Sequence, residues 1–296
     1  MDSINEPEQP LALPELSVEW IKNTKLLQVP ELAKKLLTEY AKVPSGYEMS
    51  HIKTIRDQAL ETFPYPCIGH YRFLDLQIVK SKVYDEIVTR VKRGQCLMDV
   101  GCCIGQELRQ VVHDGAPSTR LYGIDLYAGF FDVGFDLFRD RESFQGHFLA
   151  ADMFEPSYDL ARLEGSADII WTGNVLHLFD WDGQIAAMEF MLKLLNPGPG
   201  SLIAGRFMGH SKSGEYRYNF RGGLEIMYRH NEKSFRRLFQ TIIAGTSETW
   251  EVDVASPDWH ETLQLRRSED SDPTWTVEVK FVARRVQKLR ADLIDR

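Results

Sequence analysis

The sequence is poor in cysteine, and the few cysteines lack the spacing that structural roles need. Its 296 residues include only four, Cys67, Cys96, Cys102 and Cys103. These are too few and too closely bunched for a disulfide framework, and an adjacent pair does not have the spacing of zinc ligands. We therefore expect no metal site, and a reducing, cytoplasmic compartment.

An excess of basic charge and long apolar runs are also missing. The formal charge of −8 disfavours broad binding to nucleic acid or to an anionic membrane surface. No apolar run reaches the roughly 18 residues of a membrane span, and the acidic, polar N-terminus does not look like a signal peptide. What remains is the composition of an ordinary globular protein, with 43% apolar and 26% charged residues.

Residues 1–92 are expected to form an N-terminal tail and a helical cap. Apolar residues at helical spacing predict three helices, over 30–37, 50–62 and 81–92. Pro64 and Pro66 should separate the last two, because proline lacks an amide donor and restricts the residue before it.

The pattern changes near residue 93, where short apolar runs begin to alternate with helical segments. The expected strands are 96–100, 120–124, 148–151, 167–172 and 201–207, and the expected helices are 104–112, 130–140 and 183–195. Such alternation predicts a doubly wound, Rossmann-like α/β sheet with mostly parallel strands. Residues 249–254 and 275–283 alternate apolar and polar side chains, which suits an antiparallel edge. We assign residues 93–296 to one cofactor-binding domain.

The most informative segment is residues 95–105. A short apolar run contains Asp99 near its end, and Gly101 and Gly105 follow at once. Because glycine has no Cβ, such a strand-to-glycine turn lets the backbone approach a ligand closely. The helix that follows would present free amides and its positive dipole end to an anion. We expect Asp99, Gly101, Cys102 and Gly105 to contact a nucleoside cofactor.

Two further acids, Asp125 and Asp152, each follow an apolar run. In an open α/β sheet, ligands bind beyond the carboxyl ends of the strands, where these acids and Asp99 would meet. Asp125, with Leu126 beside it, can accept hydrogen bonds from both ribose hydroxyls. Asp152 can accept from an adenine amino group, and Met153 offers the ring an apolar face. A single acid after a strand is usually a helix cap, so the prediction rests on all three.

A nicotinamide dinucleotide is the main alternative cofactor, because an acid after the second strand also serves its ribose. The dinucleotide turn requires glycines in the pattern G-x-G-x-x-G, and Cys103 stands where the middle glycine should be. The chain also has no Tyr-x-x-x-Lys pair for hydride chemistry. An oxidoreductase is thus the weaker alternative, and a non-catalytic binding protein is a third.

The turn resembles the first motif of the class I S-adenosylmethionine-dependent methyltransferases, which reads acid-x-Gly-x-Gly-x-Gly. Asp99, Gly101 and Gly105 match it, whereas Cys103 replaces the central glycine. The resemblance covers roughly residues 93–283, including the antiparallel last strands. It implies S-adenosyl-L-methionine as the cofactor and a small molecule as the methyl acceptor.

A narrower resemblance links the chain to fungal methyltransferases of meroterpenoid pathways. It is carried by Tyr65-Pro66-Cys67-Ile68-Gly69 with Phe73-Leu74-Asp75-Leu76, by residues 134–141 and by residues 174–179. The resemblance implies a homodimer that forms a methyl ester on an apolar, prenylated polyketide acid. A phenol or alcohol O-methyltransferase is the alternative.

Asn174 and His177 follow the fourth strand, where a donor methyl group would point. We expect Asn174 near the cofactor and His177 near the acceptor, although His177 could equally pack in a turn. A carboxylic acid, with a pKa of about 4, is already an anion at neutral pH, whereas a phenol, at about 10, needs a base. No base dyad is evident in the sequence, which favours a carboxylate acceptor.

Residues 206–237 carry more basic than acidic side chains in an otherwise acidic protein. Such a run is usually a solvated helix face, and we expect this for most of its members. Arg206 is the exception, because it lies at the end of the predicted fifth strand. We therefore predict that Arg206 binds an anionic acceptor.

Overall fold

The computed structural model describes residues 11–12, 24–220, 223–256 and 276–287. The helices are α2 (Glu31–Lys35), α3 (Glu48–Thr62), α4 (Pro66–Gly69), α5 (Tyr84–Lys92), α6 (Gln106–His113), α7 (Gly129–Phe138), α8 (Tyr158–Ala161), α9 (Trp181–Leu194) and α10 (Glu232–Ile243). The strands are β1 (Leu11–Ala12), β2 (Leu97–Val100), β3 (Leu121–Asp125), β4 (His147–Ala150), β5 (Ile169–Gly173), β6 (Leu202–His210), β7 (Gly214–Phe220), β8 (Gly223–Arg229), β9 (Thr249–Ala255) and β10 (Thr276–Val286). Most of the predicted N-terminal tail lies outside the described residues.

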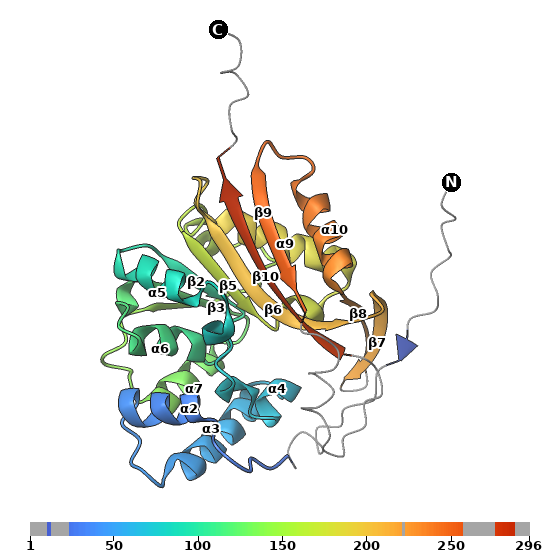
Figure 1. Cartoon of the computed structure of the whole chain (residues 1–296). Helices are drawn as coiled ribbons and strands as arrows, with labels where there is room; N and C mark the ends of the chain where they lie inside the picture. The colour runs from blue at the N-terminus through green and yellow to red at the C-terminus, as the bar shows by residue number, and fades with distance from the viewer. Residues whose placement is uncertain (1–10, 13–23, 221–222, 257–275, 288–296) are drawn as a thin grey trace.

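A seven-stranded sheet in the order β4-β3-β2-β5-β6-β10-β9 forms the centre of the molecule (Figure 1). The first five of these strands are parallel neighbours, whereas β10 runs antiparallel to both β6 and β9. The doubly wound, Rossmann-like sheet with an antiparallel edge is therefore confirmed. This order brings the carboxyl ends of β2, β3, β4 and β5 to one edge, which is where a ligand site is expected.

The segment after β6 differs from the prediction. Residues 214–220 and 223–229 form the antiparallel pair of strands β7 and β8 rather than a helix face, and β1 pairs with β7. In β8, Met227 and Arg229 are buried, whereas Ile226 is exposed and Tyr228 is only partly buried, a period-two pattern that the dense charge of the sequence obscured. Only α10 matches the expected solvated helix, with Lys233 exposed on it.

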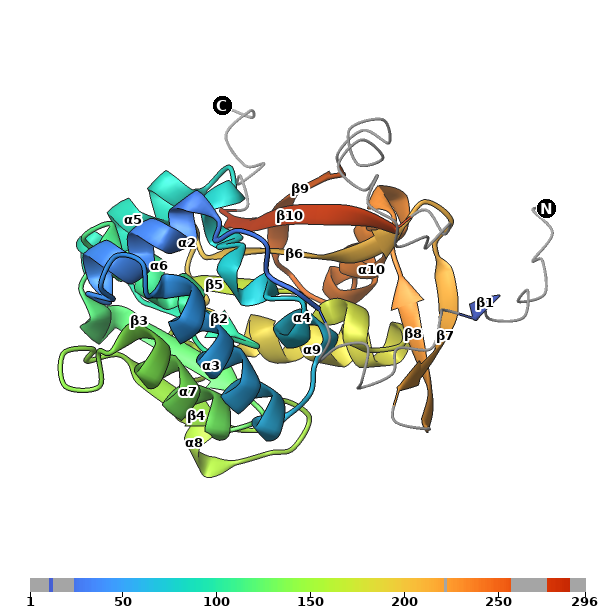
Figure 2. The ribbon, with the colours of Figure 1, turned by 90° about the horizontal axis from the view of Figure 1, so that it is seen from below.

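Helices cover both faces of the sheet. On one face α9 and α10 bury side chains such as Met188 and Phe239, and on the other α5 and α6 bury Ile87 and Leu108. The cap adds a further layer, because α2 and α3 share a core cluster with α7 rather than with the strands. Figure 2 shows α3 lying alongside α7. The domain boundary at residue 92 stays a prediction.

A buried ion pair joins the helices next to the first strand. The Arg109 guanidinium donates to Asp140 through Nε at 2.9 Å and Nη2 at 3.2 Å. Both side chains are almost fully buried, and the Tyr40 hydroxyl donates to the same carboxylate at 2.7 Å. The rings of Phe135, Phe138, Phe144 and Phe148 surround the guanidinium at 4.3–5.3 Å from their centroids. The pair thus connects α6, the end of α7 and the cap.

We expect Arg109→Met to destabilise the protein by about 3–5 kcal/mol, because the Asp140 carboxylate would stay buried without its counter-charge. The matched control is Arg141→Met, which breaks an exposed pair with Asp132 and should cost less than about 1 kcal/mol. Urea unfolding followed by circular dichroism measures both. Similar losses in the two variants would contradict the role assigned to the buried pair.

Candidate functional site

The glycine turn between β2 and α6 is held by backbone hydrogen bonds to β3. The amides of Gly101 and Cys102 both donate to the Ile124 carbonyl, at 2.8 and 3.1 Å. The amide of Cys103 donates to Asp125 Oδ2 at 2.8 Å. Three amides of the turn are therefore already paired within the protein, and they fix its shape against the end of β3.

Both glycines of the turn sit where a side chain would clash. Gly101 has φ +78°, and a Cβ on it would lie 2.1 Å from Val175 Cγ2. Gly105 has φ +69°, and its Cβ would lie 2.4 Å from Arg109 Nη1. The turn therefore packs tightly between the loop after β5 and the buried guanidinium, and only glycine fits at both positions.

Cys103 has φ +52°, in the left-handed region that glycine favours. This explains why methyltransferases of the resembling class carry glycine at the equivalent position: the turn demands a positive φ that costs an L-residue about 1–2 kcal/mol. Cys103 adopts the same backbone shape nonetheless, and its side chain packs against the cap cluster. The replacement thus leaves the turn intact.

Asp99 lies within β2 and is 2% exposed, beneath the turn rather than on its surface. Its Oδ2 has no hydrogen-bond partner among the described residues. Burial, followed by the nearby Glu107 and Asp125 carboxylates, raises the pKa of Asp99 well above its usual range. A cationic or hydrogen-donating group would satisfy this oxygen.

Glu107, which the sequence reasoning missed, connects α6 to the cap. Its carboxylate accepts from the amides of Gln77 and Ile78, at 2.8 and 2.9 Å. The side chain is 5% exposed, so these charge-assisted bonds hold Gln77 and Ile78 of the cap against α6. Its place in the first turn of the helix after the glycines is the only sequence signal, and that signal does not reveal the partner.

Asp125 ends β3 at the edge of the sheet, as predicted. Besides the Cys103 amide, its carboxylate accepts from the Tyr127 amide at 3.2 Å. Each carboxylate oxygen keeps a lone pair for a ligand. The neighbouring Leu126 is 48% exposed and presents an apolar surface beside this carboxylate.

Asp152 and Met153 follow β4 at the same edge. The Asp152 Oδ1 accepts from the Phe154 amide at 2.9 Å, which fixes the direction of the carboxylate. Met153 packs partly into the main core, while Phe154 is 41% exposed and meets Phe179 edge to face at 5.0 Å. The loops after β3 and β4 thus each carry a fixed acid and an exposed apolar side chain.

The loop after β5 holds Asn174 and His177 as the sequence predicted. Asn174 has φ +61°, its amide donates to the Arg206 carbonyl at 2.8 Å, and its buried Oδ1 has no partner among the described residues. His177 is buried, and its Nδ1 accepts from the Met208 amide at 3.4 Å. Both side chains therefore lie where β5 meets β6.

Arg206 and Arg229 lie near His177. Arg206, in β6, is 8% exposed, with Nε 3.5 Å from Glu278 Oε1. Arg229, at the end of β8, is 8% exposed and donates to the Met208 carbonyl at 3.1 Å. Burial, then Arg229 and Arg206, lower the pKa of His177 well below its usual range. Sequence reasoning missed Arg229, because its place in a hairpin was not recognised.

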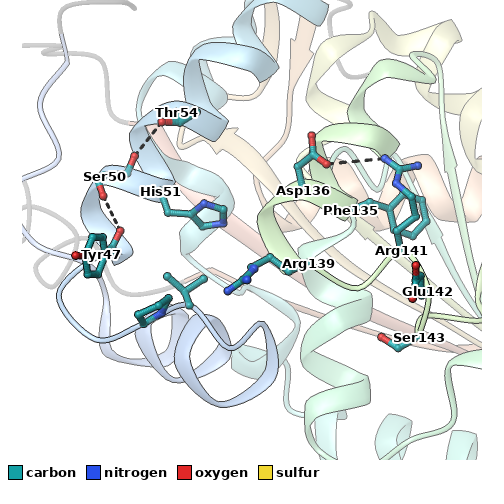
Figure 3. Close-up of a pocket in the computed structure, with 12 residues that line it drawn as sticks. Tyr47, Ser50, His51, Thr54, Phe135, Asp136, Arg139, Arg141, Glu142 and Ser143 are labelled. Atoms are coloured by element: carbon teal, nitrogen blue, oxygen red, sulfur yellow. Dashed lines mark hydrogen bonds and ion pairs between the residues drawn. The ribbon is translucent and has the colours of Figure 1, made fainter.

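A wide groove lies elsewhere on the molecule. It has a volume of about 910 Å³ between α3 and the end of α7, and none of the predicted site residues lines it (Figure 3). His51 and Arg139 point into it, but His51 Nε2 is 2.9 Å from the Leu137 carbonyl, and Arg139 donates to the Lys42 carbonyl at 2.8 Å. Its polar groups are thus used for packing the cap.

A second groove, of about 570 Å³, begins at Phe154 and Phe179 beside the predicted site. Its other lining residues include Asp180, Asp182 and Glu225. These carboxylates would repel an anionic acceptor, so the cationic surroundings of His177 are the better place for one.

Residues 20–74 match the family model described as the meroterpenoid methyltransferase N-terminal domain. The O-methyltransferase phiE of a fungal species (strain ATCC 74256) is 37% identical over 262 residues, which are 84% of this chain and 87% of that protein. The chain belongs to the fungal meroterpenoid methyltransferases. A further relative of this methyltransferase, the asnovolin E/chermesin D methyltransferase nvfJ of Aspergillus novofumigatus, is 44% identical over 69% of this chain and 73% of its own length.

Solved structures resemble this methyltransferase more weakly. A phospholethanolamine N-methyltransferase of Haemonchus contortus, solved with S-adenosylhomocysteine, is 12% identical with a TM-score of 0.49, over 79% of this chain and 61% of that one. The 1,6-didemethyltoxoflavin N1-methyltransferase of Burkholderia thailandensis is 13% identical, also at 0.49, over 83% and 92%. The assignment therefore rests on the sequence relatives.

The family and the fold confirm this chain as an enzyme of fungal secondary metabolism with S-adenosyl-L-methionine as its cofactor. The oxidoreductase and the non-catalytic binding protein are thereby set aside. Within the described ranges no helix is both long and apolar enough to cross a membrane, and no cluster of His, Cys, Asp and Glu could hold a metal ion.

We expect Gly101→Ala to destabilise this methyltransferase by about 1–3 kcal/mol more than Gly94→Ala, because the new Cβ overpacks against Val175. Gly94 is the matched control: its φ is +93°, but no atom lies within 4 Å of its added Cβ. The variants are compared by chemical unfolding and by calorimetric binding of S-adenosylmethionine. Equal stabilities and affinities would show that the contact with Val175 does not constrain the turn.

Proposed function

We propose that this methyltransferase forms a methyl ester on a carboxylate of an apolar, meroterpenoid-like intermediate. The observation that carries the proposal is the state of His177, a neutral imidazole flanked by two buried guanidinium groups. Such surroundings favour an acceptor that arrives as an anion. They disfavour one that must first give up a proton to the histidine.

The hydrogen bond to His177 supports this reading. The Met208 amide donates to Nδ1, so the single proton of the neutral imidazole belongs on Nε2. His177 then presents a donor and has no free lone pair to act as a base. We infer that its Nε2–H, together with Arg206, orients the acceptor carboxylate.

The positive charge of Arg206 is only partly balanced. Glu278 Oε1 forms an ion pair with Nε at 3.5 Å but no hydrogen bond, and a guanidinium has five donors in all. A carboxylate can bind the remaining donors in a bidentate fashion. Arg229 adds a second cation to the same region, which increases the attraction for an anionic acceptor.

The cofactor residues fit this arrangement. S-adenosylmethionine supplies an electrophilic methyl group when bound. We assign Asp99 and Asn174 to its methionyl end, because each has a buried oxygen without a partner. Asp125 suits the ribose, and the exposed Leu126 suits the adenine face. Asp152 and Met153 would hold the adenine from the next loop, while Gly101, Cys102 and Gly105 shape the turn beneath.

Methyl transfer to a carboxylate then needs positioning more than proton transfer. The reaction is an in-line displacement, and holding acceptor and donor in contact supplies much of the acceleration. Arg206 and His177 perform this task for the acceptor, from β6 and from the loop after β5. A phenol or alcohol acceptor remains the alternative, and it would require a base.

We also propose that the protein is a cytoplasmic homodimer, as the resemblance to its family implies. Its low cysteine content supports a reducing compartment. Size-exclusion chromatography with light scattering tests the dimer, and microscopy of a fluorescent fusion in the fungal cell tests the compartment. A monomer at micromolar concentration would overturn the first proposal.

The decisive experiment identifies the product. The purified enzyme is incubated with isotope-labelled S-adenosylmethionine and a panel of prenylated aromatic acids and their phenolic analogues, and products are resolved by mass spectrometry. We expect label in methyl esters, which release methanol in base, whereas aryl ethers do not. Label confined to ethers would replace the proposal with the phenol alternative.

We expect Arg206→Gln to raise the KM of the acid about 10- to 100-fold with a smaller change in kcat, because a charge-assisted hydrogen bond is lost. Lys233→Gln is the control, since it removes an exposed positive charge on α10. Steady-state kinetics at saturating cofactor measure both. An unchanged KM in a folded Arg206→Gln variant would remove Arg206 from the acceptor site.

The pH dependence provides an independent check. The lowered pKa of His177 keeps its imidazole neutral at every pH above that value, and a carboxylic acid is ionised above about pH 4. We therefore expect kcat/KM to be flat between pH 6 and 8. A phenol acceptor would instead give a rate that rises about tenfold per pH unit toward its pKa of about 10.

A further inference from the structure

An aromatic cluster joins the cap to the segment that follows Asp125. Phe63 and Tyr65 belong to the cap, and Tyr127 and Phe130 belong to the loop and helix after β3. Phe63 stacks on Tyr127 with ring centroids 4.8 Å apart, and Tyr65 lies 4.4 Å from Phe63. Tyr65 also contacts Tyr127 at 6.3 Å and Phe130 at 6.0 Å. The ring of Tyr65 is thus held by neighbours from both the cap and the sheet domain.

The same loop packs closely on the end of α3. A Cβ on Gly129 would lie 2.8 Å from Thr62 Oγ1, so the start of α7 packs against the Thr62 side chain without room for a side chain of its own. The Tyr127 amide, in turn, donates to Asp125. The position of the Asp125 carboxylate and the position of the Tyr65 ring are therefore fixed relative to each other.

The Tyr65 hydroxyl makes no hydrogen bond to any residue that the structure describes, although its ring is half-buried. Tyr40, by contrast, donates to Asp140. Burial, followed by the neighbouring Asp125 carboxylate, raises the pKa of Tyr65, and Cys103 of the glycine turn also lies close enough to contribute. The phenol is thus a protonated donor beside two elements of the cofactor site.

We propose that the Tyr65 hydroxyl binds a ribose hydroxyl of S-adenosylmethionine next to Asp125, so that the cap completes the cofactor site. The inference rests on the proposed role of Asp125 and is independent of the acceptor. It assigns to the helical cap a cofactor contact in addition to any contact with the acceptor.

The chemistry favours the ribose over other parts of the cofactor. A carboxylate only accepts hydrogen bonds, so a ribose hydroxyl beside Asp125 donates its proton to Asp125. The lone pairs of that hydroxyl oxygen then need a donor, and a phenol supplies one. Asp125 and Tyr65 form a complementary acceptor and donor for the same group.

The test measures cofactor binding without any acceptor. Tyr65→Phe removes only the hydroxyl and keeps the ring in its cluster. Calorimetry is performed with S-adenosylhomocysteine and with 5′-methylthioadenosine, which shares the ribose and adenine but lacks the amino acid. We expect the Kd of both ligands to rise about fivefold to tenfold, as for the loss of one hydrogen bond.

Tyr71→Phe is the matched control, because Tyr71 is a buried cap tyrosine whose ring lies under Arg56. It should leave both affinities unchanged, and thermal unfolding verifies that both variants fold. Unchanged affinities in Tyr65→Phe would overturn the proposal. A loss confined to S-adenosylhomocysteine would also overturn it, because the hydroxyl would then contact the methionyl group. Whether either variant still forms an ester tests only the proposal about the methyl acceptor. It does not test the contact between Tyr65 and the ribose.

Discussion

The buried pair of Arg109 and Asp140 is the constraint on which the cofactor side of this methyltransferase depends. Arg109 lies one turn into the helix that follows the glycine turn, and its guanidinium fills the space that a side chain at position 105 would need. Asp140 fixes the end of α7, and Tyr40 ties the cap to the same carboxylate. A charge pair enclosed by aromatic rings tolerates little displacement, because any shift exposes unpaired charge to an apolar environment. The turn, the cap and α7 are therefore held in one arrangement.

The two ends of the site differ in their electrostatics. Around the turn the buried groups are acids, and burial raises the pKa of Asp99. Around His177 they are cations, from β6 and β8. A positively charged methyl donor suits the first region and an anionic acceptor the second. This division of charge supports the proposal of ester formation, in which two oppositely charged reactants would meet at the carboxyl ends of β5 and β6.

Much of the fold was predictable because its signals are local. Alternating strands and helices, and the period-two pattern of the last strands, gave the sheet and its antiparallel edge. The hairpin of β7 and β8 was missed, because the basic residues in and around it suggested a solvated helix, and its buried face, with Tyr216 and Met227, depends on contacts with distant segments. The segment 134–141 was predicted as the end of a helix and as part of a family resemblance, but none of its contacts was predicted. The structure shows what these residues contact. Gly134 lets α7 approach the Ile104 carbonyl, and Asp140 accepts a hydrogen bond from Arg109.

The sequence by itself determined the kind of sheet, the glycine turn and the acids that follow its strands, because each of these is written in adjacent residues. It also determined the cofactor class through the motif at Asp99. Only the tertiary structure decided which groups face one another. Glu107 meets the cap, Arg229 joins Arg206 beside His177, and Tyr65 packs near Tyr127 of the loop after Asp125, each across many residues of chain. Such pairings arise from packing between elements far apart in sequence, and a local sequence pattern does not predict them.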